Sequence, residues 1–222
     1  MSEDLSNKRF VIFGVQGSGK SVLLKYILSH YPAHLVYDVH HEHEGFNRYK
    51  VTYRQVDHRQ KNCPAIVELN NLVNSVVLGS GQIRLFVLEE ANRYCPNHYP
   101  LPDSILVLND DQRHDRIAFG SIARRPAQLH TDLTELAHYL FIFKLTGRND
   151  YQFLEDTAMG LGDAVRSLPD FHFVVVPPDR SKFYVHAPVS FDEKKVAGGA
   201  GPGSTLEASD LTRGQVRGQN SA

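Results

Sequence analysis

The sequence predicts an α/β protein, in which a mostly parallel β-sheet is covered by helices on both faces. Short apolar runs, typical of buried strands, alternate along the chain with segments whose apolar residues recur at helical spacing. Elements that alternate in this way form parallel sheets, because each helix returns the chain to the start of the next strand. The last two apolar runs are separated only by the turn sequence PPDRS, which predicts a terminal β-hairpin.

The predicted elements follow one another with short connections. Strands are predicted at 9–13, 34–39, 49–54, 83–88, 117–123, 139–145, 171–176 and 182–186. Helices are predicted at 20–29, 64–78, 102–112, 131–137 and 150–167. Pro64 can open the second helix, since its missing N–H is not needed in the first turn. Gly160 and Gly162 predict a break inside the last helix.

Length and composition indicate one globular domain. Hydrophobic residues make up 41% of the chain and charged residues 22%, which is ordinary for a folded protein. We place the domain at 1–192. Glycine and small polar residues dominate 193–222, so this segment is predicted to be a disordered tail. The net charge of −1 leaves nucleic acid open as a partner, and any basic surface has to be local.

The cysteines and the N-terminus indicate an intracellular protein. Only two cysteines occur, Cys63 and Cys95, and they have no C-x-x-C spacing, so neither a disulfide framework nor a cysteine zinc site is expected. The opening sequence MSEDLSNKRF has acidic residues before any apolar run, so no signal peptide is predicted. No apolar stretch approaches the roughly 20 residues that span a bilayer.

The stretch GVQGSGKS matches the Walker A pattern G-x-x-x-x-G-K-[ST] in full, between a predicted strand and a predicted helix. Its glycines let backbone N–H groups face phosphates, Lys20 reaches the outer phosphates, and the Ser21 hydroxyl is a ligand for Mg²⁺. The sequence therefore predicts a P-loop site for ATP and Mg²⁺. The predicted nucleotide-binding residues are Gly14, Val15, Gln16, Gly17, Ser18, Gly19, Lys20, Ser21 and Val22.

A second motif, LFVLEE, is an apolar run that ends in Glu89 and Glu90. In a phosphate-loop ATPase the first acid holds Mg²⁺, partly through water, and the second is the general base for the attacking water. The first position is more often Asp, so the contact that Glu89 makes is left open. The alternative is a solvated acidic pair at the start of a helix, where it suits the helix dipole. Glu90 as a base would indicate a hydrolase.

Taken in order, several motifs resemble the FtsK/HerA superfamily of ring-forming, DNA-pumping ATPases. They are GVQGSGKS, YDVHHEHEGF, VLEEANRYCP, the dipeptide RH before the predicted strand at 117–123, and RRPAQLH after it. The resemblance covers about 8–190. The small size is most similar to the genome-packaging ATPases of membrane-containing icosahedral viruses and phages. The resemblance implies a P-loop NTPase fold of the RecA/ASCE type.

The resemblance also implies roles for two arginines. Arg113 matches an arginine that in this superfamily reaches the neighbouring subunit's nucleotide, so it is expected to act in trans. Arg116 and Arg148 are alternatives, and a surface role for Arg113 at a helix C-terminus is another. Arg124 stands where the superfamily usually has Gln. It is expected to sense the γ-phosphate, or to turn away and leave that role to Ser121.

Two further clusters have both a functional and a plain interpretation. The sequence HHEHE contains His40, His41 and His43, but adjacent loop residues rarely converge on one metal ion, so a metal site is not favoured. A cationic stretch follows, and it is either a solvated face or a surface that tracks DNA phosphates. Its members are Arg48, Lys50, Arg54, Arg59 and Lys61, interleaved with Tyr49 and Tyr53.

The resemblance implies an ATP-hydrolysing ring motor that translocates double-stranded DNA and packages a viral genome into a preformed capsid. It further implies a homo-oligomeric ring, a hexamer, anchored by a capsid vertex or a membrane protein, and located in the host cytoplasm or at the packaging vertex of the virion. The alternatives are a morphogenesis or secretion ATPase acting on protein partners, and a HerA-like DNA translocase of a cell or mobile element. A small-molecule kinase is disfavoured, because the sequence suggests neither a lid nor an acceptor site.

Overall fold

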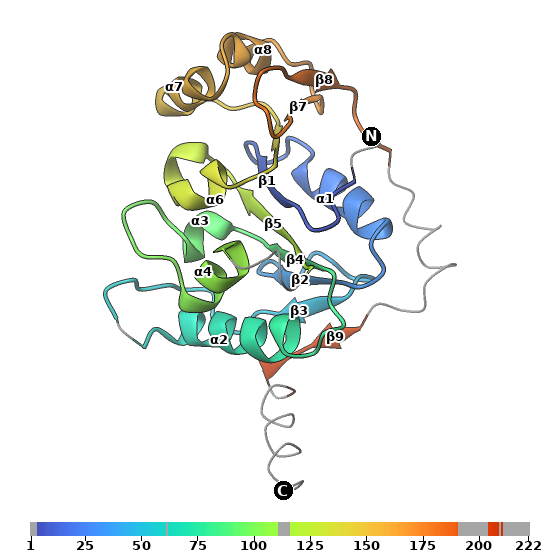
Figure 1. The fold of residues 1–222 in the computed structure, drawn as a ribbon, viewed down its shortest axis with the longest axis vertical. Coiled ribbons are helices and arrows are strands. Elements are labelled where there is room, and N and C mark those ends of the chain that lie inside the picture. The colour runs from blue at the N-terminus through green and yellow to red at the C-terminus, as the bar shows by residue number, and fades with distance from the viewer. Residues whose placement is uncertain (1–3, 61, 111–115, 191–203, 209, 211–222) are drawn as a thin grey trace, which may run out of the picture.

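A single twisted β-sheet organises the chain in a computed structural model (Figure 1). The structure describes residues 4–60, 62–110, 116–190, 204–208 and 210. Within these residues the sheet has nine strands, in the order β8-β7-β6-β1-β5-β4-β2-β3-β9. The strands are β1 (Arg9–Phe13), β2 (His34–Asp38), β3 (Arg48–Lys50), β4 (Leu85–Leu88), β5 (Ala118–Ala123), β6 (Tyr139–Ile142), β7 (Phe173–Val176), β8 (Tyr184–His186) and β9 (Thr205–Leu206).

The strand directions confirm the predicted sheet. All neighbours from β6 across to β9 pair in parallel. Strands β7 and β8 pair antiparallel to their neighbours and form the predicted terminal hairpin. The connection between β7 and β8 is too short for a crossover helix, and only an antiparallel pair can be closed by such a turn.

Helices cover both faces of the sheet (Figure 1). Helix α1 (Lys20–Ser29) packs on one face through apolar residues such as Leu24 and Ile27. The other face is covered by the remaining helices, which contribute residues to a separate apolar core. They include α2 (Pro64–Leu72) and the π-helix η1 (Val73–Leu78), α3 (Ala91–Tyr94), α4 (Asp103–Asp110), α6 (Thr131–Glu135), α7 (Arg148–Thr157) and α8 (Leu161–Arg166). The 3₁₀-helix η2 (Pro126–Gln128) follows β5.

The two cores arise from the alternation of side chains along each strand. In β1, Phe10 and Ile12 point toward α1, whereas Val11 and Phe13 point toward the opposite core. All four side chains are almost completely buried. A strand that is apolar on both faces is what a parallel sheet with two helical layers requires.

Several predicted elements differ from the structure in their bounds. The helix predicted at 64–78 continues as the π-helix η1 from Val73, and the strand predicted at 139–145 ends at Ile142. The strand predicted at 49–54 ends at Lys50, because the N–H groups of Thr52 and Tyr53 donate to the buried carboxylate of Glu68 and not to a strand. The helix predicted at 150–167 begins earlier, at Arg148, and is divided into α7 and α8. Gly160 caps α8 with a left-handed backbone (φ +78°), so the predicted break is present.

The structure corrects one part of the predicted C-terminal tail. Thr205–Leu206 forms β9, which pairs in parallel with β3. The backbone N–H of Arg48 donates to the carbonyl of Ser204 (2.9 Å). Without β9, β3 would be an edge strand with unpaired backbone groups, and such an edge is a template for a further strand. Apart from 204–208 and 210, the range 193–222 lies outside the described residues, and its disorder stays a prediction.

Two general features of the described chain bear on the expectations from sequence. Cys63 and Cys95 are both buried free thiols, and burial raises the pKa of Cys95. None of the helices in the described ranges is long and apolar enough to cross a bilayer.

The pairing of β1 with β5 offers a test of the packing. Gly120 lies beside Phe10, and a Cβ added at Gly120 would lie 2.7 Å from Cε2 of the buried Phe10 ring. We expect Gly120→Ala to lower the free energy of unfolding by about 1–3 kcal/mol through overpacking, measured by urea denaturation. Adding Phe10→Leu should recover part of this loss, because the shorter side chain makes room. Strictly additive effects of the two substitutions would contradict the close contact between Gly120 and Phe10.

Candidate nucleotide site

Three parallel strands bring the predicted site residues to one edge of the sheet. The P-loop follows β1, Glu89 and Glu90 follow β4, and Arg124 follows β5, which lies between β1 and β4. Parallel strands end on the same side of a sheet, and open α/β sheets bind their ligands at this carboxyl edge. The sequence predicted that these residues come together, and the structure places them there.

The backbone of the P-loop has the conformation that its glycines allow. Gly17 (φ +76°) and Gly19 (φ +108°) are both left-handed, and Gly19 is the N-cap of α1. The first N–H groups of α1 have no partner within the helix, so they are available to an anion. The hydroxyl of Ser18 is buried and has no hydrogen-bond partner in the described part of the chain. This orphaned polar atom and the positive helix terminus fit a phosphate group.

The P-loop is fixed against the end of β6. The N–H of Val15 donates to the carbonyl of Lys144 (3.1 Å), and the N–H of Phe143 donates to the carbonyl of Phe13 (2.8 Å). A Cβ added at Gly14 would lie 2.7 Å from Cβ of Phe143. Only glycine therefore fits at the start of the loop, and the loop cannot move away from β6 without breaking these contacts.

The ammonium group of Lys20 is held by its own loop. Its Nζ donates to the carbonyl oxygens of Gly14 (2.7 Å) and Val15 (2.8 Å). Burial lowers the pKa of Lys20; nearby Glu90 opposes this decrease and Arg124 adds to it. Lys20 therefore interacts electrostatically with Glu90 at the end of β4 and with Arg124 at the end of β5.

Glu90 is held in a strained and specific position. It has a left-handed backbone (φ 46°, ψ 42°), which is uncommon for a residue other than glycine. Its Oε1 accepts hydrogen bonds from Nη2 (3.0 Å) and Nε (3.2 Å) of Arg124, and His40 Nε2 lies 3.3 Å away. Strained residues of this kind cluster at active sites, where the surrounding structure fixes them. The strain favours Glu90 as a functional residue over a solvated acid.

Glu89 faces into the protein. Its Oε1 lies 2.6 Å from Nε2 of the buried His43, and its Oε2 accepts the backbone N–H of Val39 (3.2 Å). A carboxylate has about four acceptor sites, so these bonds leave room for a water that contacts Mg²⁺. The predicted metal contact of Glu89 and Ser21 stays a prediction, with Ser21 exposed in the first turn of α1.

Asp38 completes a buried charged cluster beside Glu89. Its Oδ2 accepts a hydrogen bond from Nη1 of Arg48 (2.9 Å) and one from the N–H of His43 (3.1 Å), and its Oδ1 accepts the N–H of Glu42 (3.0 Å). Burial opposes the ionisation of Asp38, but His43 and these hydrogen bonds outweigh it and lower the pKa. The carboxylate therefore holds the start of the loop that follows β2.

The histidines of HHEHE do not converge on one point. His43 contacts Glu89, His40 contacts Glu90, and His41 contacts the carbonyl of Val51 and the guanidinium of Arg54. Asp38, His43 and Glu89 offer ligand atoms within 4.8 Å of one another. However, Arg48 already neutralises Asp38, which disfavours a further cation. Sequence reasoning missed His40 as a partner of Glu90, although its position after β2 was a signal.

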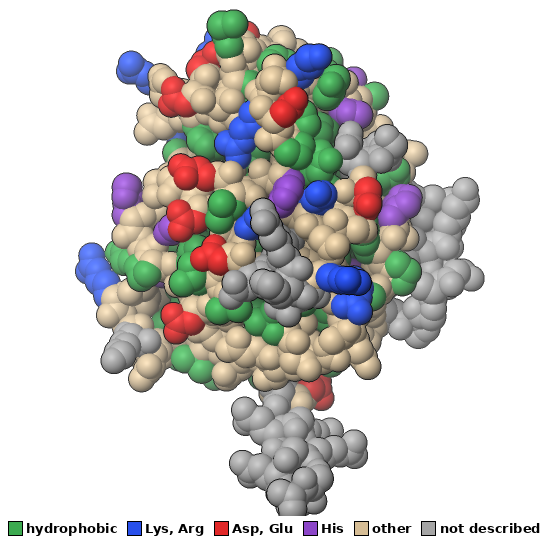
Figure 2. All heavy atoms as spheres, viewed as in Figure 1, with side chains coloured by type: hydrophobic (Ala, Val, Ile, Leu, Met, Phe, Trp, Pro, Cys, Tyr) green, Lys and Arg blue, Asp and Glu red, His purple; other side chains and the backbone are tan. Residues whose placement is uncertain are grey.

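The cationic stretch is only partly a surface. Arg48 is buried against Asp38. Tyr49 is also buried, and its hydroxyl donates a hydrogen bond to Glu68 (3.0 Å). Nζ of Lys50 lies 3.6 Å from Oε1 of Glu207. Arg54 and Arg59 are exposed, and Lys61 lies outside the described residues. On the face shown in Figure 2, basic and acidic side chains are interspersed.

Other predicted residues fall in different places. Arg113 lies outside the described residues. Arg116 and Arg148, the alternatives to it, are both exposed. Ser121, the alternative sensor to Arg124, is buried within β5.

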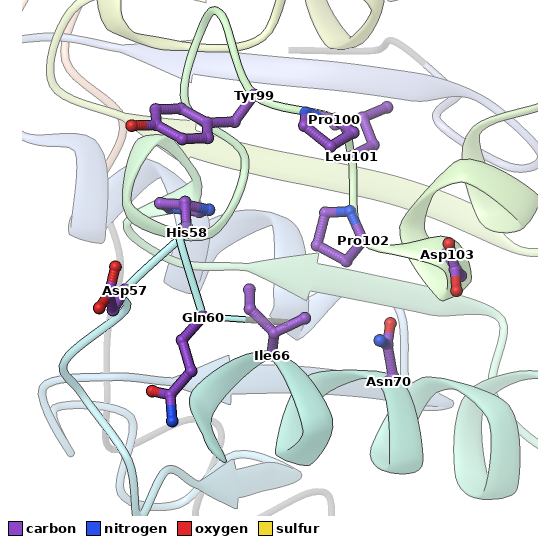
Figure 3. A pocket seen from close by; sticks show the side chains of 10 residues that line it. All are labelled: Asp57, His58, Gln60, Ile66, Asn70, Tyr99, Pro100, Leu101, Pro102 and Asp103. Atoms are coloured by element: carbon purple, nitrogen blue, oxygen red, sulfur yellow. The ribbon is translucent and has the colours of Figure 1, made fainter. Parts of the chain in front are cut away.

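The described residues form two hollows, of which one lies beside the site. One, of about 220 Å³, adjoins the P-loop and is lined by Gly19, Val22, Phe143, Phe171, Phe173, Pro188 and Val189. The other, of about 250 Å³, lies between α2 and the segments 57–60 and 99–103 (Figure 3). It includes none of the predicted site residues. In its wall His58 packs beside Tyr99, and His58 Nε2 lies 3.0 Å from the carbonyl of Arg93 in α3, the helix that Glu90 caps.

The sheet order and the loop define the class of this fold: an α/β P-loop NTPase fold with a mostly parallel sheet. No protein-family model matches the sequence, and no curated protein matches it. Solved structures do match. The genome packaging NTPase B204 from Sulfolobus turreted icosahedral virus 2, in complex with ATP-gammaS, has a TM-score of 0.70 at 15% identity, over 83% of this chain and 98% of that chain.

Two further structures are similar. B204, the DNA-packaging ATPase from Sulfolobus turreted icosahedral virus, has a TM-score of 0.69 at 16% identity, over 84% of this chain and 100% of that chain. The pCW3 conjugation coupling protein TcpA has a TM-score of 0.54 at 14% identity, over 86% of this chain and 62% of that chain. The predicted α/β P-loop NTPase fold is therefore confirmed, and this chain shares it with the packaging ATPases that it resembles.

The buried cluster gives a matched test on one strand. Arg48→Met would leave Asp38 buried without its cation, and we expect the free energy of unfolding to fall by about 3–5 kcal/mol. Lys50→Met removes an exposed ion pair on the same strand and should cost about 0–1 kcal/mol. Urea denaturation at neutral pH measures both.

The sign of the pH dependence follows from the lowered pKa of Asp38. Its ion pair stabilises the fold above the ordinary Asp pKa, and this contribution is lost as the pH falls through the folded value. The difference between Arg48→Met and wild type should therefore shrink in acid. Equal costs for Arg48→Met and Lys50→Met would contradict a buried pair.

Proposed function

We propose that this chain is an ATP-hydrolysing motor subunit that translocates double-stranded DNA and packages a viral genome into a preformed capsid. The observation that carries the proposal is the meeting of a complete P-loop, the strained Glu90 and its partner Arg124 at one sheet edge. The likeness to two viral packaging ATPases supports the choice among motors.

The P-loop would hold the triphosphate of ATP. The N–H groups at the start of α1 and the Ser18 hydroxyl contact phosphate oxygens, while Lys20 leaves the carbonyls of Gly14 and Val15 for the outer phosphates. Gln16, Gly17 and Val22 complete the cradle. Ser21 and Glu89 would hold Mg²⁺, which when bound neutralises charge on the outer phosphates.

Glu90 would act as the general base. It accepts a proton from the water that attacks the γ-phosphorus, the bond from that phosphorus to the β-bridging oxygen breaks, and ADP and phosphate leave. In the structure the Glu90 carboxylate is paired with Arg124. We infer that Arg124 turns to the γ-phosphate when ATP binds, which frees Glu90 for the water. The guanidinium of Arg124 then stabilises the negative charge that develops on the γ-phosphate in the transition state.

Assembly into a ring would complete the site. We infer that Arg113 of a neighbouring copy reaches the γ-phosphate and that the ring is a homohexamer. Exposed cations such as Arg54 and Arg59, repeated around a ring, would contact DNA phosphates without regard to sequence. A capsid vertex or a membrane protein would anchor the ring, in the host cytoplasm or at the packaging vertex of the virion.

A second candidate is a DNA translocase of a mobile element. The likeness to a conjugation coupling protein favours it, although this chain spans only 62% of that protein. Both candidates predict the same chemistry at the P-loop, and they differ in the partner that anchors the ring.

ATP hydrolysis with and without long double-stranded DNA tests the motor. We expect DNA to stimulate ATP turnover and added salt to abolish this stimulation. Contacts to DNA phosphates release counterions, so a higher salt concentration weakens DNA binding. Glu90→Gln and Arg113→Ala should each lose about 10³-fold or more in kcat. Mixing the two inactive variants should restore part of the activity, since each supplies what the other lacks.

Arg116→Ala and Arg148→Ala serve as comparisons, and both should keep their activity. Hydrolysis that is indifferent to DNA at low salt would refute the motor. A mixture that stays inactive would refute the shared site.

Adjacent arginines separate catalysis from stability. Arg124→Ala should lower kcat about 10²-fold, as expected for loss of one donor to the transition state, with little change in stability. Arg125 pairs with Asp150, whose side chain is 1% exposed (Nε to Oδ2, 2.9 Å), so Arg125→Ala should instead lower the free energy of unfolding. Steady-state kinetics and urea denaturation of both variants provide the check. Unchanged kcat in Arg124→Ala would remove Arg124 from the site.

A further inference from the structure

We propose that the apolar hollow beside the P-loop binds the base of the nucleotide by stacking, so that the site accepts adenine and guanine nucleotides alike. The inference rests on the proposed function in that it takes the P-loop as the triphosphate site. It adds the subsite for the base and the class of substrate. The hollow shares Gly19 and Val22 with the P-loop and the first turn of α1, so a triphosphate held there places the rest of the nucleotide within reach.

Phe171 is the most unusual residue of this hollow. It has a left-handed backbone (φ +62°), and the N–H of His172 donates to the carbonyl of Pro169 (3.2 Å) to close the turn around it. A bulky side chain in this region is a clear outlier, since glycine or asparagine is favoured there. The side chain is nevertheless 57% exposed. The fold thus holds a large apolar ring in solvent in a strained position, which points to a ligand for that ring.

The ring of Phe171 lies beside the P-loop. A Cβ added at Gly19 would lie 3.6 Å from Cδ1 of Phe171 and 3.2 Å from Cε1 of Phe143. Two aromatic rings therefore flank the last glycine before α1. The absence of a side chain at Gly19 keeps this approach open, and its left-handed backbone (φ +108°) favours glycine as well.

The floor of the hollow is rigid. Phe143 and Phe173 are buried, and their ring centroids lie 5.1 Å apart. Phe173 also stacks on His186 of β8 (5.5 Å, 13°). These two rings form a fixed support under the hollow, and Phe171 is the ring that is exposed to a ligand. Phe171 is the exposed wall, and Phe143 and Phe173 are the buried ones.

The size of the hollow suits part of a nucleotide. Its volume of about 220 Å³ is below the range of roughly 300–1,000 Å³ that is usual for whole small-molecule sites. A base fits such a space when the triphosphate lies outside it, on the P-loop.

The lining explains the proposed lack of base selection. All side chains that the described residues contribute to it are apolar, and Pro188 also lacks a backbone N–H. Sites that select a base strongly do so with polar groups that pair with the edge of the base, whereas apolar pockets discriminate weakly. Stacking depends on the face of the ring, and adenine and guanine present similar faces.

Tryptophan fluorescence gives a direct test, because the chain contains no tryptophan. In a Phe171→Trp variant, all indole emission comes from the hollow. We expect ATP and GTP to quench it and inorganic triphosphate, which carries no base, to leave it unchanged. A Tyr99→Trp variant is the matched control, since Tyr99 is an exposed aromatic residue in the other hollow. Its emission should not respond to any of the three.

Binding of radiolabelled ATP and GTP to the wild type separates the possible failures. If neither binds, the proposed function fails. If both bind but the emission of Phe171→Trp does not change, the base lies elsewhere and this inference is overturned. Phe171→Ala should bind ATP and GTP about tenfold more weakly and inorganic triphosphate as tightly as wild type. ATP and GTP affinities within about tenfold support stacking alone, and a preference beyond roughly 10³-fold would overturn it.

Discussion

The parallel pairing of β1, β5 and β4 is the constraint on which the rest of this structure depends. Phe13 pairs with Ala123, and Leu88 pairs with Ser121, so the three strands end within a few residues of one another. Since each strand is buried on both faces, a slip of register would expose apolar side chains and is strongly disfavoured. The sheet therefore fixes the positions at which the P-loop, Glu90 and Arg124 begin.

Charged groups at this edge have partners within the chain. Lys20 donates to its own loop, Glu90 accepts from Arg124, and Glu89 contacts His43. A ligand that draws Lys20 and Arg124 toward itself has to replace these contacts, so binding and rearrangement are linked. The buried partners of Glu89 also join the loop after β2 to the end of β4. The loop after β2 is therefore in direct contact with the end of β4.

Local sequence determined much of the fold and part of the site. The P-loop was predictable in full, because its glycines, lysine and serine are adjacent in sequence and their chemistry depends on short-range geometry. The buried strands were also predictable from local sequence, because short continuous apolar runs are typical of strands that are buried on both faces. Their ends were less so: the strand predicted to reach residue 54 stops at Lys50, because Glu68 takes the next N–H groups.

The sequence by itself determined the class of fold, the P-loop and the acidic pair at the end of β4. Only the tertiary structure decided how the charged residues divide between site and scaffold. Arg48 and Arg124 are both cations, yet one is buried against Asp38 and the other faces Glu90. The pairing of β9 with β3 and the hollow around Phe171 likewise join segments far apart in the chain. Such contacts follow from which strands become neighbours, and no local pattern encodes that choice.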